Sequence, residues 1–268
     1  RRHAGPRHRL VDFGSLSRVL FIDGRRAPET VWSQSLDCAA AAAHSRLEHD
    51  GLIEETISVV TLNDNCFAAM TTLCAVRECL VRFDLVLSLP AKPLRLGAPQ
   101  ADSDGITIRV SSHDNQGTIR FLSHGTGVAV SHVFIAGDAV RFSYTFTASP
   151  ATPVSIRTLV QFSDRTTYSF PAGLHNLDAL LAAHRTACRS FHEASSLVTG
   201  DAAVDAFRAI SLYTIRAQLT EWSIGPTLSE AYWGGGAFHD EMYPFLALIS
   251  ANHPQLAARI PRFRLQTL

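Results

Sequence analysis

The apolar residues of this chain change their spacing near residue 171, and this change separates two kinds of secondary structure. From about Glu55 to Phe170 the period is two, as between Val81 and Leu89, where every second residue is apolar. Such a period places one apolar row on one face of a β-strand. Short stretches rich in Asn, Asp and Gly separate the runs, and the connections are too short for crossover helices. The pattern predicts an antiparallel β-sandwich.

Beyond residue 173 the apolar spacing becomes helical. The apolar residues between Leu177 and Phe191 fall on one face of a helix. We expect Gly200 to end this helix, and Asp201 to cap the next because its carboxylate can accept free backbone N–H groups. Further helices are predicted from near Phe238 and from Pro254, since proline suits the first position of a helix. The chain is therefore expected to be a β-sandwich followed by an α-helical region.

Composition excludes several classes of function. Lys plus Arg and Asp plus Glu number 24 each, so the net charge is zero, which argues against nucleic acid as a partner. No apolar run approaches the ~20 residues of a membrane span. No signal-peptide pattern is visible, although a leader lost ahead of Arg1 stays open. The five cysteines form no CxxC pair and are interpreted as reduced core residues of a cytoplasmic protein.

Motifs for cofactors, metals and serine nucleophiles are missing from the sequence. Gly125-Thr126-Gly127 precedes a strand-like run rather than a helix, so it offers no helix N-terminus to a phosphate. There is no Walker, GxSxG or HExxH motif. The cluster His239-Asp240-Glu241 is not expected to bind a metal, because adjacent helical residues point about 100° apart. The sequence predicts no cofactor and no metal.

An aromatic, glycine-rich stretch that leads into a helix is the best candidate for a site. Sugar rings have apolar C–H faces and hydroxyl rims, so they need aromatic walls together with a few convergent polar groups. Such groups gather between residues 232 and 241, and Trp32 and Trp222, which lack polar neighbours, are interpreted as packing residues. The alternative is that the acidic residues only complement the helix dipole and that Trp233 is a core residue. The candidate sugar-binding residues are Tyr232, Trp233, Phe238, His239, Asp240 and Glu241.

The order of these features resembles glycoside hydrolase family 65 and its relatives in the six-hairpin (α/α) glycosidase superfamily. In that family a β-sandwich precedes an (α/α)6 barrel, and a Gly-His-x-Phe-Trp-Asp-x-Glu motif ends an early barrel loop. Residues Gly235 to Asp240 stand where this motif would lie. His239 replaces the motif's tryptophan and Gly236 its first histidine, so the chain resembles a divergent branch. The resemblance implies that Asp240 binds sugar hydroxyls and that Phe238 is the family's aromatic residue.

The resemblance also implies a mechanism and a domain plan. A carboxylic acid would protonate the leaving oxygen, while water or inorganic phosphate attacks the opposite face of the sugar. The acid is expected beyond Leu268, so this chain would hold no catalytic residue. The alternative is that Glu241 is the acid. The expected segments are a sandwich domain over 1–172, a helical linker over 173–200 and the start of the barrel over 201–268.

Two functions follow as hypotheses. In the first, the chain is part of a glycoside hydrolase or phosphorylase that acts on an oligosaccharide or glycoside. The oligomeric state stays open. The second is a non-catalytic sandwich module that binds glycans or a protein partner.

Overall fold

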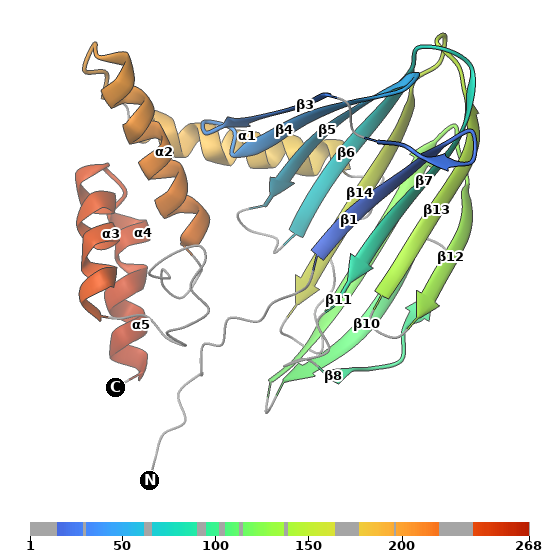
Figure 1. The fold of residues 1–268 in the computed structure, drawn as a ribbon. Coiled ribbons are helices and arrows are strands. Elements are labelled where there is room, and N and C mark those ends of the chain that lie inside the picture. The colour runs from blue at the N-terminus through green and yellow to red at the C-terminus, as the bar shows by residue number, and fades with distance from the viewer. Residues whose placement is uncertain are drawn as a thin grey trace. The chain divides into compact units, whose positions relative to one another are not determined.

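The computed structural model describes residues 15–28, 31–61, 66–89, 95–101, 105–112, 115–136, 139–163, 177–195, 197–219 and 238–267. Within these ranges two antiparallel sheets form separate layers, and helices follow them in the chain (Figure 1). The antiparallel sandwich and the helical region expected from the spacing of apolar residues are both confirmed.

Each sheet can be followed strand by strand in spatial order. The smaller sheet contains β12 (Val130–Ala136), β13 (Ala139–Ala148), β7 (Cys79–Ser88), β1 (Ser15–Ile22) and β2 (Arg25–Arg26). The larger sheet contains β3 (Val31–Asp37), β4 (Ala42–His49), β5 (Leu52–Val60), β6 (Cys66–Ala75), β14 (Val154–Ser163), β11 (Asn115–Thr126), β10 (Gly105–Ser112) and β8 (Arg95–Leu96), and β9 (Gln100–Ala101) also pairs with β10.

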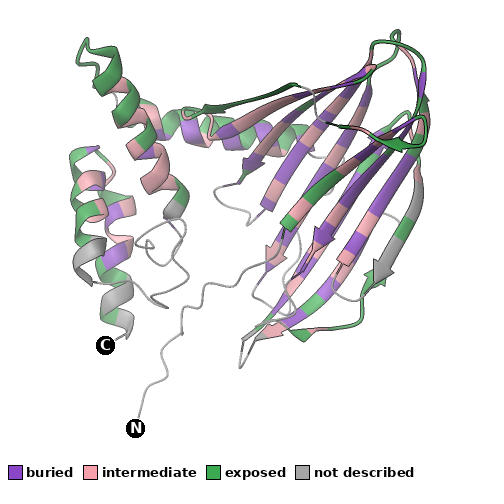
Figure 2. Ribbon diagram, viewed as in Figure 1, coloured by how far each residue is buried: buried purple, intermediate pink, exposed green. Residues whose placement is uncertain are grey.

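Apolar side chains fill the space between the two sheets. Phe121 of β11 and Phe142 of β13 meet edge to face, with ring centroids 4.7 Å apart. Phe83 of β7 is fully buried, and buried residues follow the strands of both sheets (Figure 2). Burial of these side chains is the main stabilising contribution to the sandwich, because each fully buried large apolar side chain contributes about 1.5–3 kcal/mol.

One polar cluster also lies between the sheets. The guanidinium of Arg18 on β1 contacts the buried carboxylate of Glu54 on β5 and donates to the hydroxyl of Thr56 at 2.5 Å. His49 lies with its Nε2 3.6 Å from Oε2 of Glu54, and the Thr56 hydroxyl hydrogen-bonds that of Thr71 at 2.9 Å. This cluster links β1 to β5 through charge rather than through apolar contact.

The helices in the described residues are α1 (Leu177–Ala194), α2 (Ala202–Gln218), α3 (Phe238–Ser250), α4 (Pro254–Ala257) and α5 (Arg259–Thr267). The first four begin where the sequence predicts, whereas the separate start of α5 is not predicted. The Asp201 carboxylate accepts from the backbone N–H groups of Ala203 and Val204, which confirms the predicted cap. Pro254 is the first residue of α4, as expected. Gly200 does not end α1, which stops at Ala194; its φ of +84° instead turns the chain into the cap of α2.

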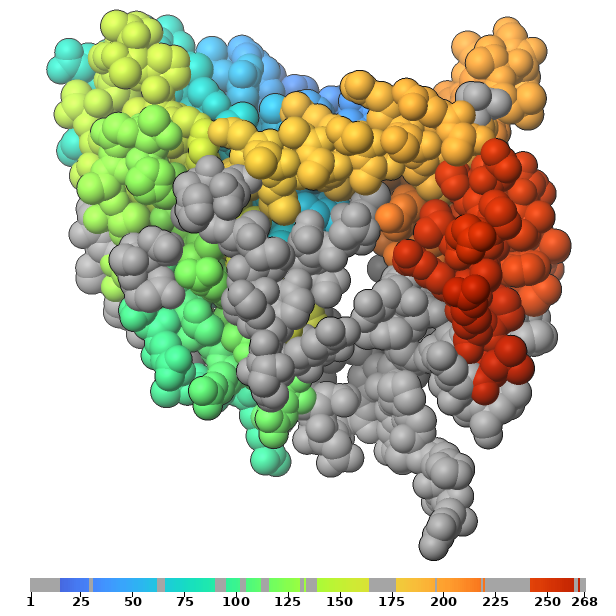
Figure 3. All heavy atoms as spheres, turned by 180° about the vertical axis from the view of Figure 1, so that it is seen from behind, coloured from blue at the N-terminus to red at the C-terminus, as the bar shows by residue number. Residues whose placement is uncertain are grey.

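The chain divides into two compact units. One holds the strands and α1 as far as His184, and the other holds Arg185–Leu268 together with Cys38–Ala41. Within the first unit, Arg157 of β14 pairs with Asp178 of α1 at 2.8 Å. In the second unit, α3, α4 and α5 form one continuous block of atoms (Figure 3). The boundaries predicted at residues 172 and 200 stay a prediction.

Several findings concern the sequence-based interpretations. The period-two pattern from Glu55 onward does not cover β1 to β4, which precede it. Trp32 does not pack into a core as predicted: it is 61% exposed on β3, an edge strand that is exposed along its whole length (Figure 2). None of the five cysteines forms a disulfide. Among the described helices, none combines the length and hydropathy that a membrane span requires.

Alkaline pH should weaken the sandwich through Tyr144. Its phenol is buried and donates to the Ser123 hydroxyl at 2.6 Å, and burial raises its pKa to about 12. Because this pKa lies above that of the unfolded chain, the unfolded state loses the proton first. The contribution of Tyr144 to stability is therefore constant below about pH 10 and falls by about 2–3 kcal/mol as the pH approaches 12. Urea unfolding between pH 9 and 12, compared with Tyr144→Phe, would measure this; an equal slope in both proteins would contradict the assignment.

Candidate functional site

The candidate sugar-binding residues fall partly inside α3. Phe238, His239, Asp240 and Glu241 form its first turn, where the exposed backbone N–H groups and the helix dipole favour acidic residues. Tyr232 and Trp233 lie outside the described residues. The structure thus places four of the six candidates in one helical turn, and their convergence with the two aromatic residues stays a prediction.

A proline inside α3 alters the backbone next to Asp240. Pro244 is the seventh residue of the helix and has no N–H to donate. In a regular helix this N–H would bond to the carbonyl four residues earlier, which belongs to Asp240. The Asp240 carbonyl therefore receives no hydrogen bond from the backbone nitrogen of residue 244.

A small apolar core holds α3 within its unit. Leu248 and Ala251 of α3 are buried together with residues of α1, α2, α4 and α5, and Phe245 packs against them. The remaining buried members of this core are Phe191, Leu212, Leu219, Ala257 and Ile260. Residues 245 to 251 are thereby anchored, so this packing positions the first turn of α3 within the helical unit.

Beside this core, a serine and a histidine lie within hydrogen-bond distance. Ser195 Oγ is 2.7 Å from Nε2 of His253, and the same nitrogen is 2.8 Å from the carbonyl of Phe191. A carbonyl only accepts, so Nε2 carries the hydrogen and donates it. Ser195 is buried, and its hydroxyl lies 2.9 Å and 3.1 Å from the carbonyls of Phe191 and Ala251.

These contacts are not those of a nucleophile and its base. A general base needs a ring nitrogen without a hydrogen facing the serine, whereas this nitrogen donates to a carbonyl. The ring of His253 instead stacks on that of Phe191, with centroids 4.1 Å apart. The Arg208 guanidinium also donates to the Ser195 carbonyl. We therefore assign Ser195 and His253 to holding the end of α1 against the α3–α4 turn.

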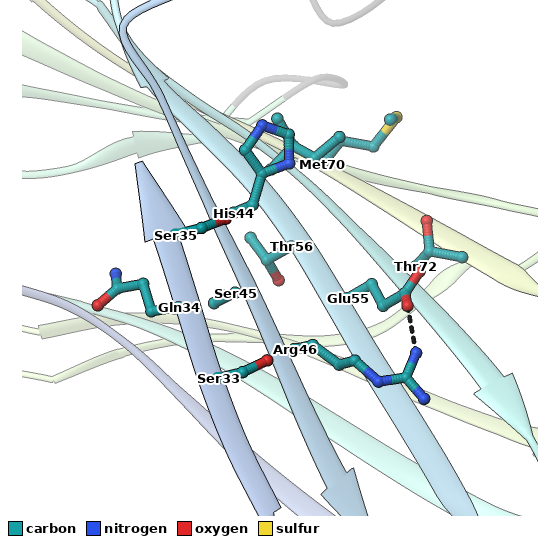
Figure 4. Close-up of a pocket in the computed structure, with 11 residues that line it drawn as sticks. Ser33, Gln34, Ser35, His44, Ser45, Arg46, Glu55, Thr56, Met70 and Thr72 are labelled. Atoms are coloured by element: carbon teal, nitrogen blue, oxygen red, sulfur yellow. Dashed lines mark hydrogen bonds and ion pairs between the residues drawn. The ribbon is translucent and has the colours of Figure 1, made fainter. Parts of the chain in front are cut away.

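Sequence reasoning missed one feature of the sandwich. A cavity of about 370 Å³ crosses β3 to β6 and is lined by eleven residues, with Arg46 paired to Glu55 at one end (Figure 4). Its residues lie on four strands and are brought together only by their register. Within the described part of the chain, no group of three or more His, Cys, Asp or Glu side chains is arranged to hold a metal ion.

Comparison with known proteins identifies the fold. No family model matches the chain, and no curated protein matches it in sequence. A human-microbiome protein assigned as a kojibiose phosphorylase superposes with a TM-score of 0.75 over 95% of this chain and 39% of its own, at 14% identity. A bacterial glucoamylase in complex with acarbose gives a TM-score of 0.61 over 92% of this chain and 44% of its own, at 10% identity.

Both proteins share their fold with this chain at low sequence identity. The likeness shows that the chain has the sandwich-and-helix fold found in them, which confirms the fold that the resemblance implied. The chain spans less than half the length of either protein.

Proposed function

We propose that this chain is part of a carbohydrate-active enzyme, a glycoside hydrolase or phosphorylase, in which Asp240 positions the sugar. The observation that carries the proposal is the fold shared over 95% of the chain with a protein assigned as a glycoside phosphorylase. A second observation supports it: Phe238, His239 and Asp240, the last residues of the segment that resembles the family's motif, lie in the first turn of α3. The proposed substrate is an oligosaccharide or glycoside.

The proposed roles follow from the chemistry of the residues. The carboxylate of Asp240 would accept hydrogen bonds from two sugar hydroxyls, while Tyr232, Trp233 and Phe238 would cover the apolar face of the ring. His239 and Glu241 would bind outer hydroxyls. The proton donor to the leaving oxygen is proposed to follow Leu268, and the attacking group is water or inorganic phosphate.

Exposed apolar side chains on two helices support a larger helical domain. Phe207 on α2 is 73% exposed, and Ile210 one turn later is also exposed. On α3, Met242, Leu246 and Ile249 recur at helical spacing and are exposed as well. Contiguous apolar surface of this kind usually contacts another part of a protein. We propose that further helices of an (α/α)6 barrel cover these faces.

We also propose the cytoplasm as the location of the protein. The described cysteines include buried ones, such as Cys66 and Cys188, and none forms a disulfide. Thiols of this kind are typical of a reducing compartment.

Replacing Asp240 tests the proposed function. In the full-length protein, Asp240→Asn should lower kcat/KM about 10- to 100-fold, because a charged hydrogen-bond acceptor for the sugar is weakened. Turnover of a panel of disaccharides, with and without inorganic phosphate, would measure this and also separate hydrolysis from phosphorolysis.

The matched control is Glu193→Gln, an equally conservative change at an exposed position of α1 in the same unit. It should leave turnover unchanged. Absence of turnover in the full-length protein, or equal turnover in Asp240→Asn, would reject the enzyme and favour a non-catalytic module that binds glycans or a protein partner.

A further inference from the structure

The cavity on the sandwich is built from two rows of side chains on one face of the larger sheet. Residues 54 and 56 point towards Arg18 of the other sheet, so residues 55 and 57 point away from it. Cross-strand pairing then defines the rows on this outer face. One row is Ser33, Arg46, Glu55 and Thr72, and the other is Ser35, His44, Ile57 and Met70. All eight residues line the cavity.

The two rows differ in chemistry. The first row presents hydroxyls, a guanidinium and a carboxylate, whereas the second includes the apolar side chains of Ile57 and Met70. In Figure 4, His44 and Met70 lie together at one end of the cavity, while Arg46 and Glu55 meet at the other. The floor is therefore amphipathic, with an apolar strip beside a line of hydrogen-bonding groups.

The charges in the cavity favour a neutral ligand. Arg46 donates to Glu48 through Nη2 at 3.0 Å and Nε at 3.3 Å, and to Glu55 through Nη1 at 2.5 Å. Hydrogen bonds to Glu48, and then to Glu55, raise the pKa of Arg46, so it stays charged. Glu48 and Glu55 thus compensate the single guanidinium, so Arg46 offers no uncompensated positive charge to an anion. Two of the five guanidinium N–H groups remain outside these bonds and can donate to a ligand.

We propose that this cavity is a second saccharide site, separate from Asp240, which binds a neutral hexose or a short neutral oligosaccharide. A donor from Arg46 beside an acceptor from Glu55 matches a pair of neighbouring sugar hydroxyls, each of which both accepts and donates. The C–H face of the ring lies against Ile57 and Met70, and Ser33, Ser35 and Thr72 reach its outer hydroxyls. The volume of about 370 Å³ lies within the usual range for small-molecule sites.

Ligand-observed NMR on the 268-residue chain tests this site. The probes are glucose and maltose, with glucose 6-phosphate as the anionic counterpart. Saturation transfer should appear for the neutral sugars and be much weaker for the phosphate ester. Arg46→Met and the isosteric Glu55→Gln should each weaken maltose binding by at least about tenfold.

The matched control is Arg77→Met, which removes another exposed arginine from an ion pair, here with Asp23 at 3.0 Å, away from the cavity. It should bind maltose as the unchanged chain does. The proposal is overturned if the chain binds none of the neutral sugars, if both cavity variants bind as well as Arg77→Met, or if glucose 6-phosphate binds more tightly than glucose. Binding lost in Asp240→Asn but kept in Arg46→Met would likewise overturn it, while supporting the proposed role of Asp240.

Discussion

Phe191→Ala is expected to unfold the helical unit while the sandwich stays folded. Phe191 is 5% exposed, stacks on His253 and belongs to a core with few other buried side chains. Truncating a buried phenylalanine typically costs about 3–5 kcal/mol, which is a large part of the stability of a small unit. Helical circular dichroism should fall at 222 nm, and hydrogen exchange of the strand amides should stay as slow as in the unchanged chain.

The control for this change is Phe207→Ala, which removes the same atoms from a position that is 73% exposed on α2. It should leave the helical signal and its urea midpoint unchanged. If Phe191→Ala and Phe207→Ala have equal effects, the core described around Leu248 is not what holds these helices together.

Arg18→Met is expected to destabilise the sandwich by about 2–3 kcal/mol. Glu54 has a side chain that is only 4% exposed, and Arg18 is the cation in contact with it. Removing one partner of a buried pair leaves an uncompensated charge, which costs about 3–5 kcal/mol when both partners are fully buried. We lower this range because the Arg18 side chain is 31% exposed and water can partly replace it. Urea unfolding of the chain at neutral pH would measure the change.

The double variant Arg18→Met with Glu54→Leu distinguishes charge from packing. It removes both charges and should regain most of the lost stability, because apolar replacement of a buried pair is often neutral. Arg77→Met, in an ion pair with both side chains about half exposed, should have no measurable effect. A double variant as unstable as Arg18→Met alone would mean that the side-chain volume of Arg18 matters rather than its charge.

Much of the fold could be predicted from local patterns. The alternation from Val81 to Leu89 corresponds to β7, whose odd-numbered residues from Val81 to Leu87 are buried. The Asp201 cap and the start of α4 at Pro254 were also predicted correctly, because each depends on one residue and its near neighbours. Trp32 was interpreted wrongly, since its exposure depends on β3 being an edge strand.

The two candidate sites differ in the same way: local sequence predicted one of them and could not predict the other. The first turn of α3 was found from its sequence, since its aromatic and acidic residues are contiguous. The cavity was not, because Ser33, Arg46, Glu55 and Thr72 lie in four separate strands. A single-residue shift in any of these pairings would send its side chains to the opposite face.

The amino-acid sequence alone therefore specifies many of the strands and helices, the cap of α2 and the position of the acidic residues that follow an aromatic stretch. These properties depend on interactions within a few residues of one another. The strand order, the register that aligns Arg46 with Glu55 and the burial of Glu54 against Arg18 arise only when distant segments pair. Periodicity along one strand carries no information about which partner it will have, so these features required the folded chain.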